Sequence, residues 1–361
     1  MRPARLVSWL LAGLLAACAG PRPAPTPAPT RKAPVLGEAA GQLGPAQWVA
    51  RARAAFERGE YGRAIEAAQR ARTQAPDLAE AWRLEARARE ATSDLAGARE
   101  AWAGVMDRLP GDAGAVEAYA RLSARLGREA ESWQGLTGRG AVAAGWAGWL
   151  ALRAGRADEA SRLLETAVGA EEGDRWWVPL GRARLLRGDL AGAAEAAQAA
   201  VERWPRDPEA WGLRGDVARE QGLGAEARSA YEEALRLDPG RYAARVNLAV
   251  VLLGQGEAAE AEAVLREAIG REPGRPEAWN DLGLALRSQG RYAEAAEAYR
   301  KALEARPGYL PALKNLGICY EKYLGRQAEA VQVYDRYLDL SPDDREVARW
   351  RKAAKRRARE R

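Results

Sequence analysis

From residue 45 onward, apolar and polar residues follow the spacing of amphipathic helices, and this pattern recurs about every 34 residues. The clearest unit is AWNDLGLALRSQGRYAEAAEAYRKALEARPGY at 278–309. It holds two helical stretches separated by a glycine, and a proline closes it. Aligned on this unit, the repeats start at residues 45, 79, 113, 141, 174, 208, 242, 276 and 310. The pattern therefore predicts about nine successive pairs of helices.

A few residue types recur at fixed places in these units. Glycine, which accepts the left-handed conformation that ends a first helix, occurs at positions 59, 127, 155, 188, 222, 256, 290 and 325. The second helix carries alanine at positions 64, 98, 160, 193, 227, 261, 295 and 330. Small residues let the helix axes approach closely, and large residues such as Trp177 and Trp279 fill the space beside that contact.

This combination resembles the tetratricopeptide repeat (TPR), over about 300 of the 361 residues. The resemblance implies an all-α fold, a right-handed α-solenoid of about nine TPR helix pairs whose first helices line a concave surface. It also implies a non-catalytic scaffold that binds other proteins.

Two units depart from the pattern. Unit 113–140 is shorter than the others and rich in glycine in its second half, which predicts a short or irregular second helix. This break suggests an N-terminal lobe at 45–140 and a C-terminal lobe at 141–344. The last unit, 310–344, has one extra residue before Gly325, which predicts a longer turn between its two helices.

Residues 345–361 predict a basic C-terminal helix. Val347, Trp350, Ala354 and Ala358 are spaced by three or four residues and form one apolar stripe. Such a helix is suited to cap the last repeat, as a solenoid requires. Its Arg and Lys side chains are also suited to bind anionic partners, such as lipid phosphates or an acidic protein surface, and the two roles are compatible.

The N-terminus predicts export. Residues 1–17 begin with Arg2 and Arg5 and continue with an apolar run too short to span a bilayer, as in a signal peptide. The run Leu15-Ala16-Ala17-Cys18 resembles the lipobox of bacterial lipoproteins. This resemblance implies cleavage between Ala17 and Cys18 and acylation of Cys18. Because Ala19 stands where inner-membrane lipoproteins of enteric bacteria carry Asp, it favours the outer membrane, facing the periplasm. The alternative is a secretion signal with an incidental cysteine.

Residues 18–44 follow as the lipidated cysteine and a linker with alternating prolines. Such a linker favours an extended polyproline II conformation and serves as a semi-rigid tether. A proline-rich ligand for another domain is the alternative.

Composition removes many kinds of chemistry. The chain has no histidine and only two cysteines, Cys18 and Cys319, so His-dependent catalysis, His-ligated metals and four-cysteine zinc sites are excluded. It has no GxxxxGK[ST] phosphate loop. The abundant carboxylates are expected on solvated helix faces, and Cys319 as a packed thiol. We therefore expect no catalytic residue, no metal and no cofactor.

The net charge of +6 comes from the two ends of the chain. Residues 45–344 carry 47 acidic and 42 basic side chains, whereas residues 345–361 carry nine basic and two acidic ones. A nucleic-acid-binding domain needs basic groups gathered on its folded face. We therefore expect no nucleic-acid partner.

The resemblance to TPR proteins implies that ligands contact the inner face of the first helices. The candidates are Trp146, Trp149, Arg153, Arg182, Asp216, Arg219, Asn247, Val250, Asn280, Arg287, Lys314, Asn315 and Ile318. The three asparagines form an approximate ladder suited to hydrogen-bond an extended backbone, and the basic residues suit carboxylates. The Lys/Asn/Arg set of a two-carboxylate clamp is not in register. A generic inner face without a dedicated ligand is the alternative.

These features predict an exported, lipid-anchored scaffold that resembles the TPR lipoproteins of bacterial envelope machines, such as type IV pilus pilotins and gliding-motility lipoproteins. Its partners would be other envelope proteins, bound in the concave groove, and the membrane, through the lipid anchor. The leading hypothesis is assembly of a motility, pilus or secretion complex, because many repeats offer a long surface. The alternative is a regulator that binds peptidoglycan synthases or hydrolases.

Overall fold

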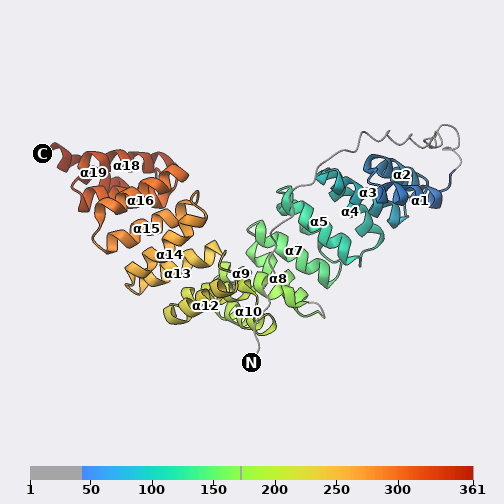
Figure 1. Cartoon of the computed structure of the whole chain (residues 1–361), viewed down its shortest axis with the longest axis horizontal. Helices are drawn as coiled ribbons and strands as arrows, with labels where there is room; N and C mark the ends of the chain where they lie inside the picture. The colour runs from blue at the N-terminus through green and yellow to red at the C-terminus, as the bar shows by residue number, and fades with distance from the viewer. Residues whose placement is uncertain (1–42, 171–172, 361) are drawn as a thin grey trace, which may run out of the picture. The chain divides into compact units, whose positions relative to one another are not determined.

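The computed structural model describes residues 43–170 and 173–360 (Figure 1). Ala17, Cys18 and the proline-rich tether lie outside the described residues, so the expectations about them stay predictions. Within the described ranges every regular element is helical. No helix there combines the length and the apolar character needed to cross a bilayer.

The elements follow the predicted units closely. The α-helices are α1 Pro45–Glu57, α2 Tyr61–Gln74, α3 Ala79–Ala91, α4 Leu95–Arg108, α5 Ala113–Arg125, α6 Glu129–Ser132, α7 Ala141–Arg153, α8 Ala157–Val168, α9 Trp177–Leu186, α10 Leu190–Arg203, α11 Pro208–Glu220, α12 Gly224–Leu237, α13 Tyr242–Gly254, α14 Ala258–Arg271, α15 Pro276–Ser288, α16 Tyr292–Ala305, α17 Leu310–Ile318, α18 Gln327–Leu340 and α19 Arg345–Arg359. Short 3-10 turns occupy Gln134–Leu136 and Gly173–Trp176. The chain is thus an α-solenoid of helix pairs, as the sequence predicts.

Glycine ends the first helix in most pairs, as expected. Gly59 has φ 75° and Gly290 has φ 78°, both in the left-handed region that a side chain disfavours. Unit 79–112 has Ser93 at this place, and Ser93 adopts the same conformation with φ 62°. The turn is therefore kept even where the glycine is absent.

The first helices lie on the inner side of the solenoid. Each second helix packs on the first helix of the next unit, and first helices also contact one another, as α7 does α9 and α13 does α15. Second helices make no comparable contact with one another in the part of the chain that the structure describes. The first helices are therefore closer together and line the concave side, as the TPR resemblance implies.

Small residues allow the close helix contacts. The recurring alanines of the second helices, among them Ala64, Ala261 and Ala295, are fully buried. A Cβ added to Gly283 would lie 2.4 Å from the ring of Tyr299, and one added to Gly215 would lie 2.5 Å from that of Tyr231. These glycines are needed because an aromatic ring from the second helix rests directly on their backbone.

A tryptophan of one unit is hydrogen-bonded to the proline that closes the preceding unit. The indole Nε1 of Trp82 donates to the carbonyl of Pro76 at 2.9 Å. Trp211 and Trp279 do the same toward the carbonyls of Pro205 and Pro273, also at 2.9 Å. The recurring tryptophans are thus packing residues that fix the connection between units, which agrees with their regular spacing.

The two irregular units differ in how they fit the prediction. Helix α6 spans only four residues, which confirms the expected short second helix. One buried cluster contains both Leu136 and Ala143, so packing continues across residue 140 and the division into two lobes stays a prediction. In the last unit the expected longer turn is wrong. The extra residue is absorbed by a π-helical turn at Cys319–Tyr323, and the turn that follows has the usual three residues.

Helix α19 caps the C-terminal end. Val347 and Ala354 are fully buried against the last repeat, and Trp350 is partly buried. The carboxylate of Asp344 accepts hydrogen bonds from the backbone N–H groups of Glu346 and Val347, which starts the helix. The predicted capping role is therefore confirmed.

Candidate binding groove

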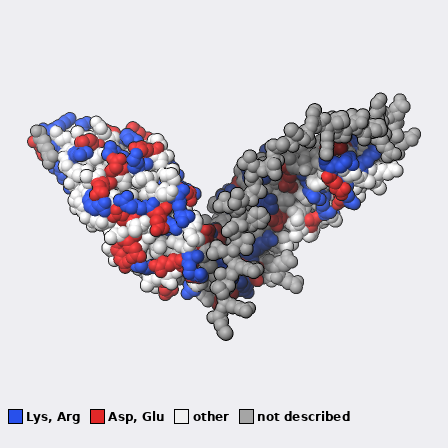
Figure 2. Space-filling model, viewed as in Figure 1, with Lys and Arg blue, Asp and Glu red and all other residues white. Residues whose placement is uncertain are grey.

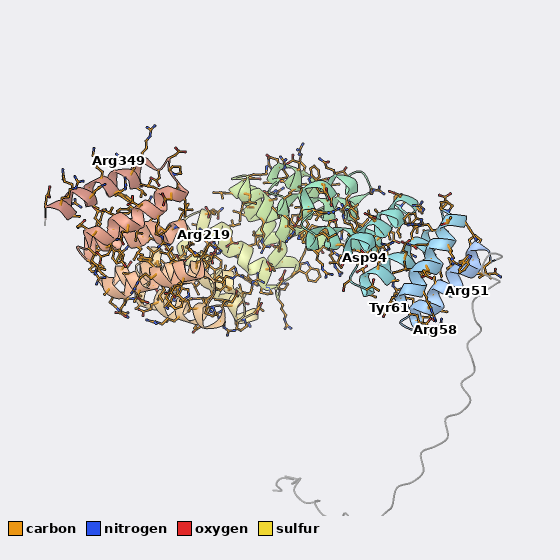
Figure 3. The ribbon with its side chains drawn as sticks, turned by 90° about the horizontal axis from the view of Figure 1, so that it is seen from above. Arg51, Arg58, Tyr61, Asp94, Arg219 and Arg349 are labelled. Carbon is orange, nitrogen blue, oxygen red and sulfur yellow. The ribbon has the colours of Figure 1, made fainter. Side chains whose placement is uncertain are left out.

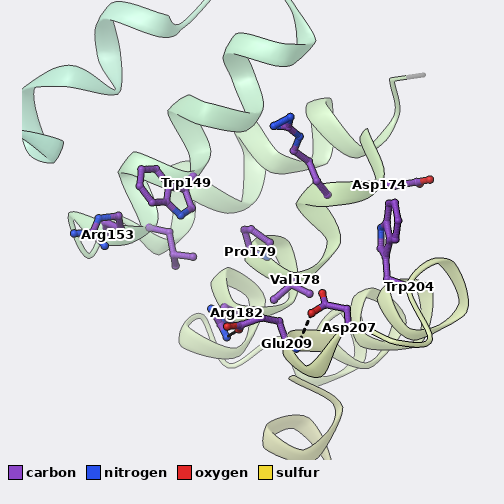
Figure 4. A pocket seen from close by; sticks show the side chains of 11 residues that line it. Trp149, Arg153, Asp174, Val178, Pro179, Arg182, Trp204, Asp207 and Glu209 are labelled. Carbon is purple, nitrogen blue, oxygen red and sulfur yellow. Dashed lines mark hydrogen bonds and ion pairs between the residues drawn. The ribbon is translucent and has the colours of Figure 1, made fainter. Parts of the chain in front are cut away.

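A groove of about 610 Å³ runs along the inner side between α7, α9 and α11 (Figure 4). Its lining residues come from the first helices and from the segments that connect to them: Trp149, Leu152, Arg153, Asp174, Arg175, Val178, Pro179, Arg182, Trp204, Asp207 and Glu209. Three of these, Trp149, Arg153 and Arg182, are among the residues that the sequence places on the inner face.

The groove has an apolar stretch that is open to solvent. The ring of Trp149 packs edge-on against Trp146 at 5.5 Å, and Trp146 packs edge-on against Trp176 at 5.2 Å. Trp146 therefore supports Trp149 from behind. Trp204, which is 50% exposed, stands across the groove with Pro179 between them (Figure 4). An exposed tryptophan of this kind is suited to receive an apolar side chain.

Charged side chains border this stretch. Arg153 lies 5.2 Å from the ring centre of Trp149 and pairs with Glu129 at 2.8 Å. Arg182 pairs with Glu209, which also binds Arg241 at 2.6 Å. Burial alone would raise the pKa of Glu209, but the charges and hydrogen bonds of Arg182 and Arg241 outweigh it and hold that pKa below its usual range. A carboxylate ligand would thus compete with Glu209 for Arg182.

The asparagine ladder exists, but its members are bonded to neighbouring helices. Asn247 donates from Nδ2 to Asp216 Oδ1 at 2.9 Å. Asn315 donates to Asn280 Oδ1 at 2.9 Å, and Asn280 donates to Asp281 at 3.0 Å. Asn280 is only 5% exposed, so it is not an accessible ligand contact, and the expectation for it is wrong. Asn280 lies one repeat position before Asn247 and Asn315, and its side chain is therefore turned toward the contact between α15 and α17.

The remaining candidates lie outside the groove. Lys314 pairs with Glu346 at 3.0 Å and lies 5.1 Å from the ring centre of Trp350, so it holds α19 in place. Arg219, marked in Figure 3, pairs with Glu220 at 2.8 Å. Val250 is 39% exposed, and Arg287 has no carboxylate partner in residues 43–170 and 173–360. Ligand contacts at Arg219, Asn247, Val250, Arg287, Lys314 and Asn315 stay predictions.

Sequence reasoning missed Trp204 and Pro179. Trp204 follows α10, a second helix, and directly precedes the closing Pro205, whereas ligand contacts were expected only on first helices. The signal in the sequence was a tryptophan at a place where other units have Ala75, Asp238 or Glu272.

The described residues contain no group of three or more side chains that could hold a metal ion. Cys319 is buried and lies 3.3 Å from the carbonyl oxygen of Tyr292, as a weak thiol donor. Burial raises the pKa of this thiol, which makes it less reactive.

Comparisons with known proteins agree with the repeat pattern. A family model described as tetratricopeptide repeat matches residues 49–113, 147–208, 179–242, 213–276 and 246–309. A second tetratricopeptide repeat model matches residues 286–353. No curated protein matches the chain.

Solved structures of similar proteins cover about half of the chain. MamA is 25% identical, covers 47% of this chain and 92% of its own, and gives a TM-score of 0.41. A thermophilic TPR protein of Thermus thermophilus is 26% identical, covers 48% of this chain and 95% of its own, and gives a TM-score of 0.42. YrrB, described as a TPR protein with an unusual peptide-binding site, is 22% identical. It covers 53% of this chain and 99% of its own, and gives a TM-score of 0.42.

Proposed function

Because the chain belongs to the tetratricopeptide repeat family, we propose that it is a non-catalytic scaffold that holds an extended segment of a partner protein in the groove between α7, α9 and α11. The observation that carries this proposal is the pair Trp149 and Trp204, which leave an open apolar space on the inner side. The recurring tryptophans Trp82, Trp211 and Trp279 are packing residues bonded to a proline, whereas Trp204 is 50% exposed.

The lining of the groove indicates the kind of segment that fits. An apolar or aromatic side chain would occupy the space between Trp149 and Trp204, where desolvation makes such anchors the strongest part of an interface. The lining also holds Arg153, Arg175, Asp174 and Asp207, which can pair with charges of either sign along the segment. Polar rim contacts of this kind set orientation more than affinity.

A photo-crosslinking amino acid at position 204 identifies the bound partner, and Trp204→Ala then tests the groove. We expect the variant to bind that partner about tenfold more weakly or worse, because an anchoring tryptophan dominates such interfaces. The fold should be unchanged, since half of this side chain is in solvent. Leu186→Ala is the matched control, because Leu186 is 68% exposed and lies outside the groove. Equal binding by wild type and Trp204→Ala would exclude this groove.

The wider setting of this scaffold is also a proposal. The signal sequence 1–17 and the lipobox at Cys18 support an exported lipoprotein, anchored in the outer membrane and facing the periplasm. There it would assist assembly of an envelope machine for motility, a pilus or secretion. The alternative is a regulator of peptidoglycan synthases or hydrolases. The crosslinked partner distinguishes the two, because an assembly component and a cell-wall enzyme differ in sequence family.

A further inference from the structure

Helix α19 has two sharply different faces. Its inner face carries the buried Val347 and Ala354 and packs on the last repeat. On the opposite side, five basic residues recur at spacings of four and three and form one row along the helix: Arg345, Arg349, Lys352, Arg356 and Arg359. All five are exposed, and Lys355, also exposed, lies next to them.

This row carries almost no compensating charge. Arg345, Lys352, Lys355 and Arg359 have no carboxylate partner among the described residues. Arg356 has only the distant Glu360, at 3.7 Å. Arg349, marked in Figure 3, donates from Nε to the backbone carbonyl of Arg345 at 3.2 Å. The basic residues that have close acidic partners, Arg351 and Arg357, pair with Asp335 and Glu321 of the last repeat.

The body of the solenoid is different. There, acidic and basic side chains alternate over the surface, as the face in Figure 2 shows. Arg228, for example, pairs with Glu232, Glu257 and Glu260 at 2.6 to 2.8 Å. The row on α19 is therefore a local concentration of positive charge at the end of a mildly acidic solenoid, since residues 45–344 carry more acidic than basic side chains.

The chemistry of this face limits what it can bind. Its exposed side carries no aromatic or large apolar residue, so it lacks the apolar core of a stable protein–protein interface. The large apolar residues of the helix, Val347 and Trp350, already pack on the last repeat, so the helix has no large apolar face left to insert into a bilayer. A straight row of long cationic side chains matches a flat surface with many anionic groups.

We propose that this basic row docks on the anionic headgroups of a lipid bilayer. Lys and Arg near an anionic membrane surface each contribute about fivefold to binding, and the attraction extends only about one Debye length. The preference for a bilayer over a nucleic acid rests on the export signal in the proposed function. The docking itself does not depend on the groove between α7, α9 and α11.

The test uses the full chain with Cys18→Ser, so that no acyl chain contributes, and measures flotation with vesicles. Phosphatidylglycerol-rich vesicles supply the anionic surface, and phosphatidylcholine vesicles give the background from residues 1–17. We expect binding to the anionic vesicles that is lost at high salt. Lys352→Gln, Lys355→Gln and Arg359→Gln combined should weaken it about 100-fold, because three charges are removed.

The matched control combines Arg125→Gln, Arg156→Gln and Arg206→Gln, three exposed arginines of the solenoid whose side chains have no partner in the described ranges. It removes the same net charge and should bind the anionic vesicles like wild type. The proposal is overturned if the α19 variant binds the anionic vesicles as well as the protein with the intact row does, or if the control loses as much binding as the α19 variant. It is also overturned if the protein with the intact row binds duplex DNA more tightly than the vesicles. Circular dichroism of each variant confirms that the helices are intact.

Discussion

Asp281 occupies the repeat position that Asn247 and Asn315 hold in the neighbouring units. Asn247 and Asn315 each donate to the preceding first helix, whereas Asp281 accepts a hydrogen bond from Asn280 of its own helix and is the only one of the three that ionises. Burial raises the pKa of Asp281 to about 6, and repulsion from Glu277 adds to this, while the hydrogen bond from Asn280 acts in the opposite direction. The carboxylate is thus poorly matched to its surroundings at neutral pH.

Asp281→Asn should therefore stabilise the protein at pH 7. The folded state holds the proton of Asp281 more tightly than the unfolded state, whose pKa is near 3.8. The contribution of Asp281 to folding stability is therefore fully present below a pH of about 3.8, and it is lost as the pH rises through about 6. An amide avoids that loss, so the free energy of unfolding should increase by up to about 3 kcal/mol at pH 7. Urea unfolding at pH 7 and at about pH 4 measures it.

The two pH values provide the control for this change. Near pH 4 the carboxyl is protonated in the folded protein, so the variant and wild type should have nearly equal stability. Asp216→Ala should instead lower stability, because it removes the oxygen Oδ1 that accepts hydrogen bonds from Tyr231 at 2.7 Å and from Asn247 at 2.9 Å. If Asp281→Asn raised the free energy of unfolding by the same amount at both pH values, the effect would come from packing and not from charge.

At the residue scale, the sequence predicts roles that depend on spacing but not those that depend on a partner. The packing role of Trp279 follows from its recurrence, and its bond to Pro273 agrees with it. Asn280 lies one position from the ladder, and only the structure shows that it faces Asn315 on the next first helix and is buried. The repeat position of a residue determines on which face of the helix its side chain lies. Which residue that side chain contacts depends on how the units stack.

Helix pairs approach closely where a glycine meets an aromatic ring. Gly283→Ala should destabilise the protein by about 1–3 kcal/mol, because the new Cβ would lie 2.4 Å from the ring of Tyr299, which is fully buried and cannot move aside. Thermal or urea unfolding measures the change.

Gly270→Ala is the matched control: Gly270 lies in α14 with nothing within 4 Å of its Cβ position. It should gain about 0.5–1 kcal/mol from the helix preference of alanine. Equal effects of the two changes would contradict the close contact.

At the element scale, most helix boundaries could be predicted because glycine, proline and the alanine positions mark them. The exceptions arise where a marker is absent or displaced. Arg99 links α6 to α5 by donating to Ser132 of α6 at 2.7 Å and to Tyr119 of α5 at 3.0 Å, contacts that no spacing indicates. The extra residue of the last unit enters a π-helical turn, because the helix can absorb it without shifting the glycine that ends it.

At the scale of the whole molecule, the order of helix pairs follows from the sequence, but the position of the groove does not. The groove requires Trp149 of one unit, Pro179 of the next and Trp204 at its end to face one another. These residues are far apart along the chain and stand at different repeat positions. Their meeting depends on the stacking of two units, which the repeat pattern alone does not describe.

The proposed lipid anchor and the basic row of α19 would hold the protein at a membrane by different physical means. Acyl chains bind through burial of methylene groups, at about 0.8 kcal/mol each, and salt does not weaken this. The basic row binds through charge, which salt screens. Cys18→Ser should therefore abolish palmitate labelling and leave a membrane association that a high-salt wash releases, whereas the wild-type protein should resist the same wash.

Cell fractionation with and without the salt wash, together with labelling, measures this outcome. The combined change of Lys352, Lys355 and Arg359 to Gln in the wild-type background serves as the complementary control, because it removes the charges but keeps Cys18. That protein should stay with the membrane in both washes, since several acyl chains anchor far more strongly than one. Labelling that persists in Cys18→Ser would contradict the lipoprotein assignment, because Cys319, the other cysteine, is buried in α17 and its π-helical extension and is not accessible to acylation.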